Sequence, residues 1–228
     1  MESRVGVGET LRETFAIYRA HAGVLLPVAF WLFLSVAVLE ALFDESIALV
    51  SLALLALVLT FLYQGLVVGL VRNDRAGRRD SSIGELVRSV LPVLLPLVGV
   101  GLIGAIGIFF GTLLLVIPGL YLLVIWAVAA PAVVIERKGV FDALGRSRQL
   151  VRGHGWQVLW VMLVAVGIGF AADLLLTSLA AELADGPILE AVFYALSSTV
   201  TAPIEALVAA VLYFRLLELE PPPPPSGD

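Results

Sequence analysis

The placement of charge between six long apolar runs constrains this sequence most. All fourteen basic residues lie in four segments: before the first run, between the second and third, between the fourth and fifth, and at the end of the sixth. The intervening gaps are acidic or carry no charge. Because short basic loops are retained in the cytoplasm, this alternation is typical of a multi-pass membrane protein with both termini cytoplasmic.

The apolar runs have the length that a membrane requires. A helix rises about 1.5 Å per residue, so roughly 20 residues cross a hydrocarbon layer ~30 Å thick. Runs this long that are apolar on every side argue against buried helices of a soluble protein. We predict an all-α, polytopic membrane domain over residues 1–220, with spans at 24–43, 47–71, 97–117, 120–135, 156–180 and 188–214. A turn at Pro118-Gly119 separates the third span from the short fourth span, and residues 221–228 are predicted to form a disordered, proline-rich tail.

Composition supports a membrane protein. Hydrophobic residues make up 60% of the chain and charged residues 14%, whereas soluble domains are about half apolar and a quarter charged. The chain has no cysteine, which excludes disulfides and thiolate metal sites. Arginine supplies all but one of the basic residues, which favours a GC-rich coding sequence and a bacterial plasma membrane.

Each pair of spans follows a short amphipathic stretch. The three stretches open at Gly6, Ser82 and Gly139, and each of these small residues precedes an acid by three positions, as at a capped helix start. The sequence therefore predicts three units, each an amphipathic helix followed by a hairpin. These helices either lie in the headgroup plane, with arginines on anionic lipid, or act as cytoplasmic elbows that set the tilt of the next span. We favour the elbow.

The basic loops define a predicted inner surface. Its residues are Arg72, Arg75, Arg78, Arg79, Arg137, Lys138, Arg146, Arg148 and Arg152. They lack the aromatic interleaving of a nucleic-acid site, so membrane lipids are the expected contacts and nucleic acid is not. A protein partner or a homo-oligomer stays open.

The middle of the chain carries a distinctive pattern of residues. It consists of Ile117-Pro118-Gly119-Leu120-Tyr121, Trp126, Ala130-Pro131, Glu136, Ala143-Leu144, Ser147, Arg152-Gly153 and Trp156, followed later by Ala202-Pro203 and Leu212-Tyr213-Phe214-Arg215. This pattern resembles the membrane domain attached to bacterial glycerophosphoryl diester phosphodiesterases, which also occurs in stand-alone proteins. Ile125 departs from the basic residue that members place before the tryptophan, and the sequence holds no phosphodiesterase barrel. The resemblance implies a six-helix membrane domain, and because the barrel is absent no hydrolytic activity is carried over from the family.

Glu205 is the most unusual polar residue. It lies ten residues before Arg215, about 15 Å along a helix, which places it near the middle of the membrane. An ionised carboxylate there costs several kcal/mol, so the group must be protonated, paired or open to an aqueous cavity. Gln64, at similar depth, and Ser198 and Thr201, on nearly the same helical face, are candidate hydrogen-bond partners. Glu205 serves either a proton- or substrate-linked site or, as we favour, a structural hydrogen bond inside the bundle.

Other polar and small residues have simpler structural explanations. Gly104, Gly107 and Gly111 share one face of the third span, which predicts close helix packing. Asp173 is expected near the outer boundary of its span, at the interface. Two histidines without cysteine do not make a metal site, so no metal is predicted.

The sequence contains none of the common catalytic signatures, such as a nucleophile elbow, a zinc motif or a phosphate-binding glycine loop. No catalytic residue and no cofactor are therefore predicted. The leading interpretation is a non-catalytic integral membrane protein that organises lipid or a partner protein. The alternative is a small transporter or channel that uses Glu205 and Gln64, and an intramembrane enzyme is a weaker third possibility.

Overall fold

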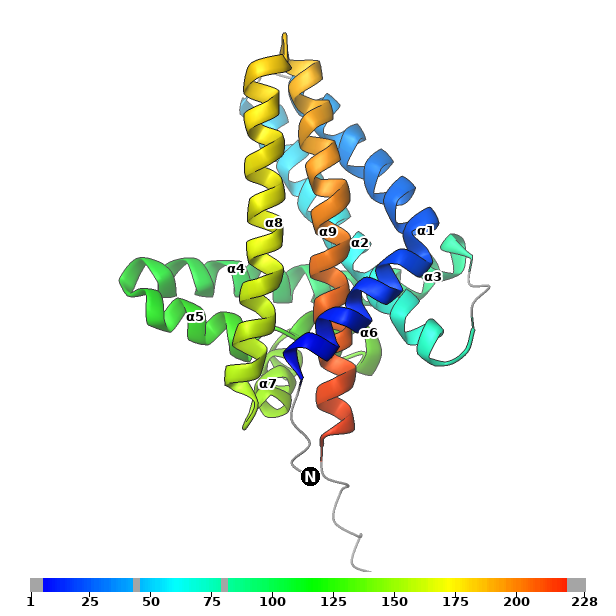
Figure 1. Ribbon diagram of the computed structural model, residues 1–228, viewed down its shortest axis with the longest axis vertical. Coiled ribbons are helices and arrows are strands. Elements are labelled where there is room, and N and C mark those ends of the chain that lie inside the picture. The colour runs from blue at the N-terminus through cyan, green and yellow to red at the C-terminus, as the bar shows by residue number, and fades with distance from the viewer. Residues whose placement is uncertain (1–5, 43–45, 79–81, 221–228) are drawn as a thin grey trace, which may run out of the picture.

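The computed structural model describes residues 6–42, 46–78 and 82–220, and the regular elements within these ranges are helices (Figure 1). They are α1 (Val7–Leu42), α2 (Ser46–Arg75), α3 (Ile83–Val90), the 3₁₀ helix η1 (Leu91–Val93), α4 (Leu94–Leu114), α5 (Val116–Ile125), α6 (Ala129–Glu136), α7 (Val140–Val151), α8 (Gly155–Leu183) and α9 (Pro187–Glu218). Six segments in these ranges are long and apolar enough to cross a membrane. The predicted all-α architecture is confirmed. The tail at 221–228 lies outside the described residues.

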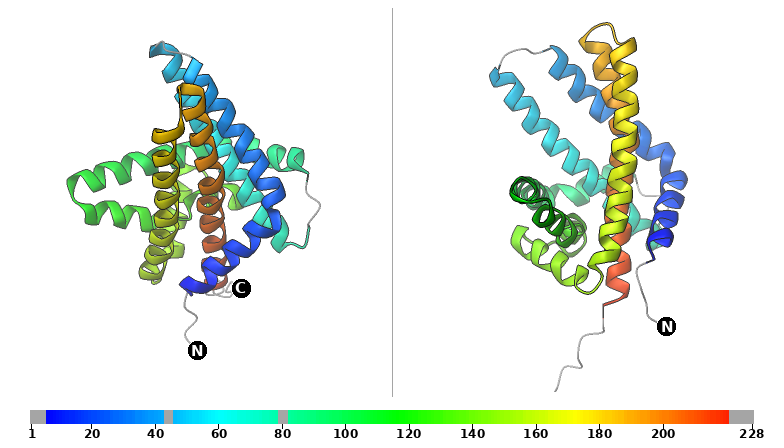
Figure 2. Two further views of the ribbon diagram at one scale, coloured as in Figure 1. Left: turned by 45° about the horizontal axis from the view of Figure 1, so that its top comes forward. Right: turned by 60° about the vertical axis from the view of Figure 1, so that its left-hand side comes forward.

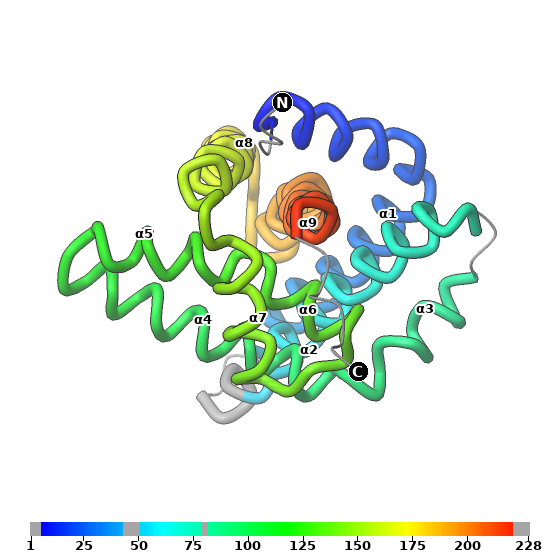
Figure 3. The backbone as a smooth tube through the Cα atoms, turned by 90° about the horizontal axis from the view of Figure 1, so that it is seen from below, coloured from blue at the N-terminus to red at the C-terminus, as the bar shows by residue number. Residues whose placement is uncertain are grey.

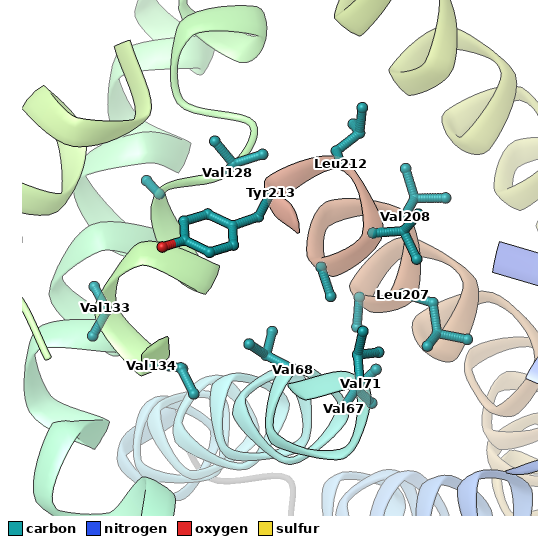
Figure 4. Packing of buried hydrophobic residues seen from close by; sticks show 14 of the residues in the cluster. Val67, Val68, Val71, Val128, Val133, Val134, Leu207, Val208, Leu212 and Tyr213 are labelled. Carbon is teal, nitrogen blue, oxygen red and sulfur yellow. The ribbon is translucent and has the colours of Figure 1, made fainter. Parts of the chain in front are cut away.

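Helix α9 is the centre of the molecule. It packs against α1, α2, α6, α7 and α8, and the view along its axis shows it enclosed by its neighbours (Figure 3). Its second half is almost fully buried, in a layer of branched aliphatic side chains (Figure 4). Residues of this layer include Val67, Val68 and Val71 of α2, Val133 and Val134 of α6, and Leu207, Val208, Leu212 and Tyr213 of α9. The core therefore lies toward the end of the bundle where α9 finishes, which we call the terminal end.

Helix α1 joins the first predicted amphipathic helix and the first span into one element. The sequence predicts two segments, whereas the structure has a single helix that bends on its way up the molecule (Figure 1). Pro27 lies inside α1, lacks an amide donor and crowds the preceding turn, which bends a helix without ending it. In the third unit the two elements do separate, because Gly153, with a φ of 89°, makes the turn between α7 and α8.

The α4–α5 hairpin runs across the direction of α8 and α9. Figure 1 shows it projecting sideways, and the right-hand view of Figure 2 shows it nearly end-on while α8 and α9 stay upright. The exposed apolar residues at its tip are Leu113, Leu114, Leu115, Val116 and Ile117. Such a surface is suited to lipid, and the hairpin does not run alongside the other long helices.

The hairpin turns at Leu115, and the predicted turn at Pro118-Gly119 is wrong. Leu115 is extended, with φ −162° and ψ 139°, between the end of α4 and the start of α5. Pro118 lies in the first turn of α5, where a helix needs no amide donor. Gly119 lies against the backbone of Thr112, so its missing side chain serves close packing and not a turn.

The fourth predicted span, 120–135, is broken into α5 and α6. Residues 126–128 are not helical, which corrects the continuous helix expected there. Pro131 has no amide to bond the carbonyl one turn earlier, so the helix is interrupted before it. The buried amide of Val128 instead donates to the hydroxyl of Ser147 in α7, at 3.2 Å. A hydrogen bond from another helix thus supplies the partner that this amide lacks at the break.

Candidate functional site: an acidic cavity beside α9

A cavity of about 790 Å³ follows the first half of α9, between this helix and α1, α2 and α8. It extends from Ala181 and Glu190, near the α8–α9 turn, to Glu205. That stretch of α9 corresponds to about 22 Å along the helix axis. The remaining lining residues are Phe33, Thr60, Asp173, Thr177, Ala180, Phe193, Tyr194, Ser197, Ser198, Thr201 and Ala202.

The cavity is acidic. Glu205 and Asp173 both line it, together with Glu190, and none of the lining residues that the structure describes is basic. The carboxylate of Asp173 accepts a hydrogen bond from the hydroxyl of Ser197 across the α8–α9 hairpin. Gly169 of α8 lies beside Glu205, since a Cβ there would be in ordinary contact, 3.4 Å from the Oε1 atom of Glu205.

Hydroxyl groups complete the lining. The Thr201 hydroxyl donates to the Ser197 carbonyl at 3.1 Å, which satisfies its donor and leaves its oxygen able to accept. Ser198, Thr177 and Thr60 also face the cavity. The site therefore offers carboxylate and hydroxyl oxygens to a ligand, a donor set suited to a positively charged group.

The structure brings together three of the four polar residues predicted from the sequence. Glu205, Ser198 and Thr201 share the cavity, whereas Gln64 does not line it. Glu205 is exposed and has no hydrogen-bond partner among the described residues, so the expected hydrogen bond to Gln64 is absent there. The favoured interpretation, a carboxyl enclosed and bonded inside the bundle, does not match this geometry.

Asp173 is the residue that sequence reasoning undervalued. Its depth along α8 placed it at the interface, but the structure places it in the same cavity as Glu205. The position of Asp173 opposite α9 could have been predicted from the α8–α9 hairpin. In an antiparallel hairpin, residues equally distant from the turn, here near Gly186, face each other. Asp173 and Ser197 are nearly equidistant from that turn, which a count across the hairpin would have shown.

The cavity stops at the core. Beyond Glu205, residues 206–213 of α9 are buried against α2 and α6 (Figure 4). Pro203 lies inside α9 just before Glu205 and leaves the carbonyl of Thr199 without its helical donor. The cavity thus follows the half of α9 nearer the α8–α9 turn and ends at the buried core.

Some predicted inner-surface cations bind the chain's own carboxylates. Arg75 of α2 pairs with Glu13 of α1 and, at 2.5 Å, with Glu218 of α9. Arg215 pairs with Glu13 at 2.9 Å and with Glu9 at 3.2 Å. These ion pairs tie α1, α2 and α9 together at the terminal end.

A second ion cluster holds the end of α9 to α6 and α7. Arg146 donates to Glu136 at 2.8 Å and to both carboxylate oxygens of Glu220, at 2.5 and 2.7 Å. Glu136 also pairs with Lys138 at 2.9 Å and accepts from the Tyr213 hydroxyl at 2.6 Å. The hydrogen bonds from Arg146 hold the pKa of Glu220 below its usual range.

The other predicted inner-surface arginines are not held in this way. Arg72, Arg78, Arg137, Arg148 and Arg152 form no ion pair with any described residue. Arg79 lies outside the described residues. The basic surface therefore divides into arginines that bind within the protein and arginines that are available to other anions.

Two of the three predicted packing glycines lie at a close approach. A Cβ on Gly107 would come 2.5 Å from the Trp126 ring, and one on Gly111 would come 3.0 Å from the amide nitrogen of Gly119. A Cβ on Gly104 would meet no atom within 4 Å. Gly104 therefore takes no part in this close approach among the described residues.

Comparisons of the chain with protein-family models, with curated proteins and with solved structures found no match. The family resemblance of the central stretch stays a prediction. Among the residues with described positions, no three histidine, aspartate or glutamate side chains gather in a way that could hold a metal ion.

Proposed function

We propose that this chain is a multi-pass plasma-membrane protein with cytoplasmic termini, and that it binds and carries a small organic cation in the acidic cavity. The observation that supports this is the opening of Glu205 and Asp173 into one cavity whose described lining has no basic residue. This geometry favours the transporter alternative over a membrane module that only organises lipid or a partner.

The energetics of charge at membrane depth support a cationic ligand. A carboxylate at membrane depth costs several kcal/mol unless another charge, a proton or water offsets it. Two carboxylates in one low-dielectric cavity also repel each other, and a bound cation relieves both penalties. Placing a charged ligand in the cavity therefore lowers the free energy only when the ligand is a cation. This difference makes the site selective for cations over anions.

The aromatic lining favours an organic cation over a bare metal ion. Phe33, Phe193 and Tyr194 line the cavity together with the carboxylates. Aromatic faces attract ammonium groups, and quaternary ammonium ligands are commonly held this way. The volume of about 790 Å³ lies within the range of small-molecule sites.

The orientation proposed from the basic loops directs the cavity to the outside. If the terminal end is cytoplasmic, the layer around Leu207 and Leu212 closes the inner side. Release to the cytoplasm then requires this layer to open. Pro203, beside Glu205 in α9, is the position where that helix bends most easily.

Binding of tetraphenylphosphonium to the full-length protein in nanodiscs tests the ligand class, with tetraphenylborate as an anion of similar shape. Relative to empty nanodiscs, we expect the protein to add binding of the cation and to add none of the anion. Glu205→Gln and Asp173→Asn should each weaken cation binding tenfold or more, since about 1.4 kcal/mol of lost charge pairing is a tenfold change. Glu182→Gln is the matched control, because Glu182 is exposed near the same turn but does not line the cavity.

Uptake of tetraethylammonium, which does not cross lipid by itself, into proteoliposomes tests carriage. We expect uptake by the native protein and its loss in Glu205→Gln. Equal binding of cation and anion, or unchanged cation binding in both cavity variants, would refute the proposed ligand class. Cation binding without uptake would refute carriage and leave a receptor for the same ligand.

A further inference from the structure

A second hollow lies away from the α8–α9 turn, between α5, α7 and the start of α8. Its volume is about 710 Å³. The wall that α5 contributes is apolar, with Leu120 and Val124, and Leu159 of α8 continues it. Arg148 of α7 and Arg152, directly after this helix, lie along its other side. The hollow thus combines an apolar wall with a cationic edge.

The two arginines are free to bind an anion. They are one helical turn apart, so they stand on the same side of α7, and both are exposed. Neither side chain forms a hydrogen bond or an ion pair with any residue of the described ranges. Arg146, on the same helix, contrasts with them because Glu136 and Glu220 hold it.

The start of α8 adds backbone donors to the same edge. Gly153 and Gly155 line the hollow, beside the first amides of α8. These amides have no partner within the helix, and the N-cap residue His154 makes no side-chain hydrogen bond to them. A helix start also carries a partial positive charge that attracts phosphate.

The aromatic lining of the hollow is typical of a membrane interface. Trp156 lines it, is 67% exposed and stacks edge-to-face with Trp160, with ring centroids 5.8 Å apart. Tryptophans are enriched where hydrocarbon meets headgroups. We therefore place the cationic edge at headgroup level. Helix α5, which forms the apolar wall, belongs to the hairpin that projects sideways (Figure 1).

We propose that this hollow binds one anionic phospholipid. The phosphate lies between Arg148 and Arg152 at the start of α8, and an acyl chain lies along Leu120, Val124 and Leu159. A soluble phosphate would use the cationic edge alone, whereas a lipid matches both the charge and the apolar wall. The site is separate from the acidic cavity, and its binding does not depend on the function proposed above.

Native mass spectrometry of the full-length protein in detergent measures this binding directly. The probes are dioleoyl phosphatidylglycerol, dioleoyl phosphatidylcholine and glycerol 3-phosphate as the soluble phosphate. We expect phosphatidylglycerol to bind with clear preference over both other probes. Arg148→Gln with Arg152→Gln should weaken it roughly 30-fold, from the usual contribution of two basic groups near anionic lipid.

Two further variants make the result specific. Arg12→Gln with Arg19→Gln removes two exposed, unpaired arginines from α1, outside the hollow, and should leave binding unchanged. Leu159→Trp fills the apolar wall and should weaken phosphatidylglycerol binding without weakening any binding of glycerol 3-phosphate.

Three results would overturn the proposal. Equal binding of the two lipids would show that the arginines do not select the headgroup. Full competition by glycerol 3-phosphate would assign the site to soluble phosphate. If the double variant of Arg12 and Arg19 lost as much phosphatidylglycerol binding as the double variant of Arg148 and Arg152, the loss would be due to net charge and not to this hollow. Because Arg148 and Arg152 have no partner in the described structure, their replacement should not impair folding.

Discussion

Replacing Gly119 by alanine should open the α4–α5 hairpin. A Cβ at this position would lie 2.0 Å from the Thr112 hydroxyl oxygen, 2.7 Å from the Thr112 amide nitrogen and 2.9 Å from its Cα atom. The hydroxyl can rotate away, but the two backbone atoms move only if α4 and α5 separate. The added methyl group therefore acts on the helix spacing and not on one rotamer.

The expected cost follows from overpacking. Extra methyl groups in a tightly packed interior cost about 1–3 kcal/mol, and backbone contact places Gly119→Ala toward the upper end. At roughly 2–4 °C per kcal/mol for a chain of this size, the melting temperature should fall by about 2–12 °C. Gly104→Ala is the matched control on α4, because a Cβ there meets no atom within 4 Å. It should melt at or slightly above the native temperature.

Thermal unfolding in detergent, followed by tryptophan fluorescence, measures both variants. Trp126 packs on Gly107 near the same hairpin, so its emission also reports the separation of the two helices. The reasoning is refuted if the two alanine variants melt together, or if Gly104→Ala is the less stable. Either result would mean that α4 and α5 do not approach each other at Thr112.

Three further changes test other contacts. Ser147→Ala leaves the buried amide at the break between α5 and α6 without its acceptor, and should cost about 1–3 kcal/mol in chemical unfolding. Leu212→Ala should cost about 2–5 kcal/mol in the same assay, while Leu113→Ala, at the exposed hairpin tip, should cost little. Because Arg146 depresses the pKa of Glu220, their contribution is present above the ordinary glutamate pKa of about 4.3 and is lost as pH falls through the lower folded value. Melting curves should therefore show a smaller acid-induced drop in Glu220→Gln than in the native chain.

Hydropathy and charge located the membrane segments because both are properties of a one-dimensional sequence. Local sequence patterns predicted the turns less well, because one residue type can serve two structural purposes. Proline and glycine occur in turns, but Pro118 here occupies a first helical turn and Gly119 a close helix contact. The sequence alone does not distinguish these uses, since the partner Thr112 is identified only once the hairpin is formed.

Contacts between distant segments account for the other differences. The break before α6 depends on Ser147, which approaches Val128 only when α7 packs against α6. Asp173 was placed by its depth along one helix, whereas its role depends on what faces it across the hairpin. The depth of Glu205 was predictable by counting residues, but its exposure in a cavity depends on how α1, α2, α8 and α9 are spaced.

Cysteine labelling tests the central claim, an acidic cavity that opens to the outside, most directly. The chain has no cysteine, so a single Ser198→Cys variant reports only on the cavity. In intact cells, membrane-impermeant methanethiosulfonates should modify it, and the trimethylammonium reagent should react faster than the sulfonate because Asp173 and Glu205 attract cations. Leu207→Cys, in the closed layer, should not react. Failure of Ser198→Cys to react from outside, or a faster reaction with the sulfonate, would contradict the account.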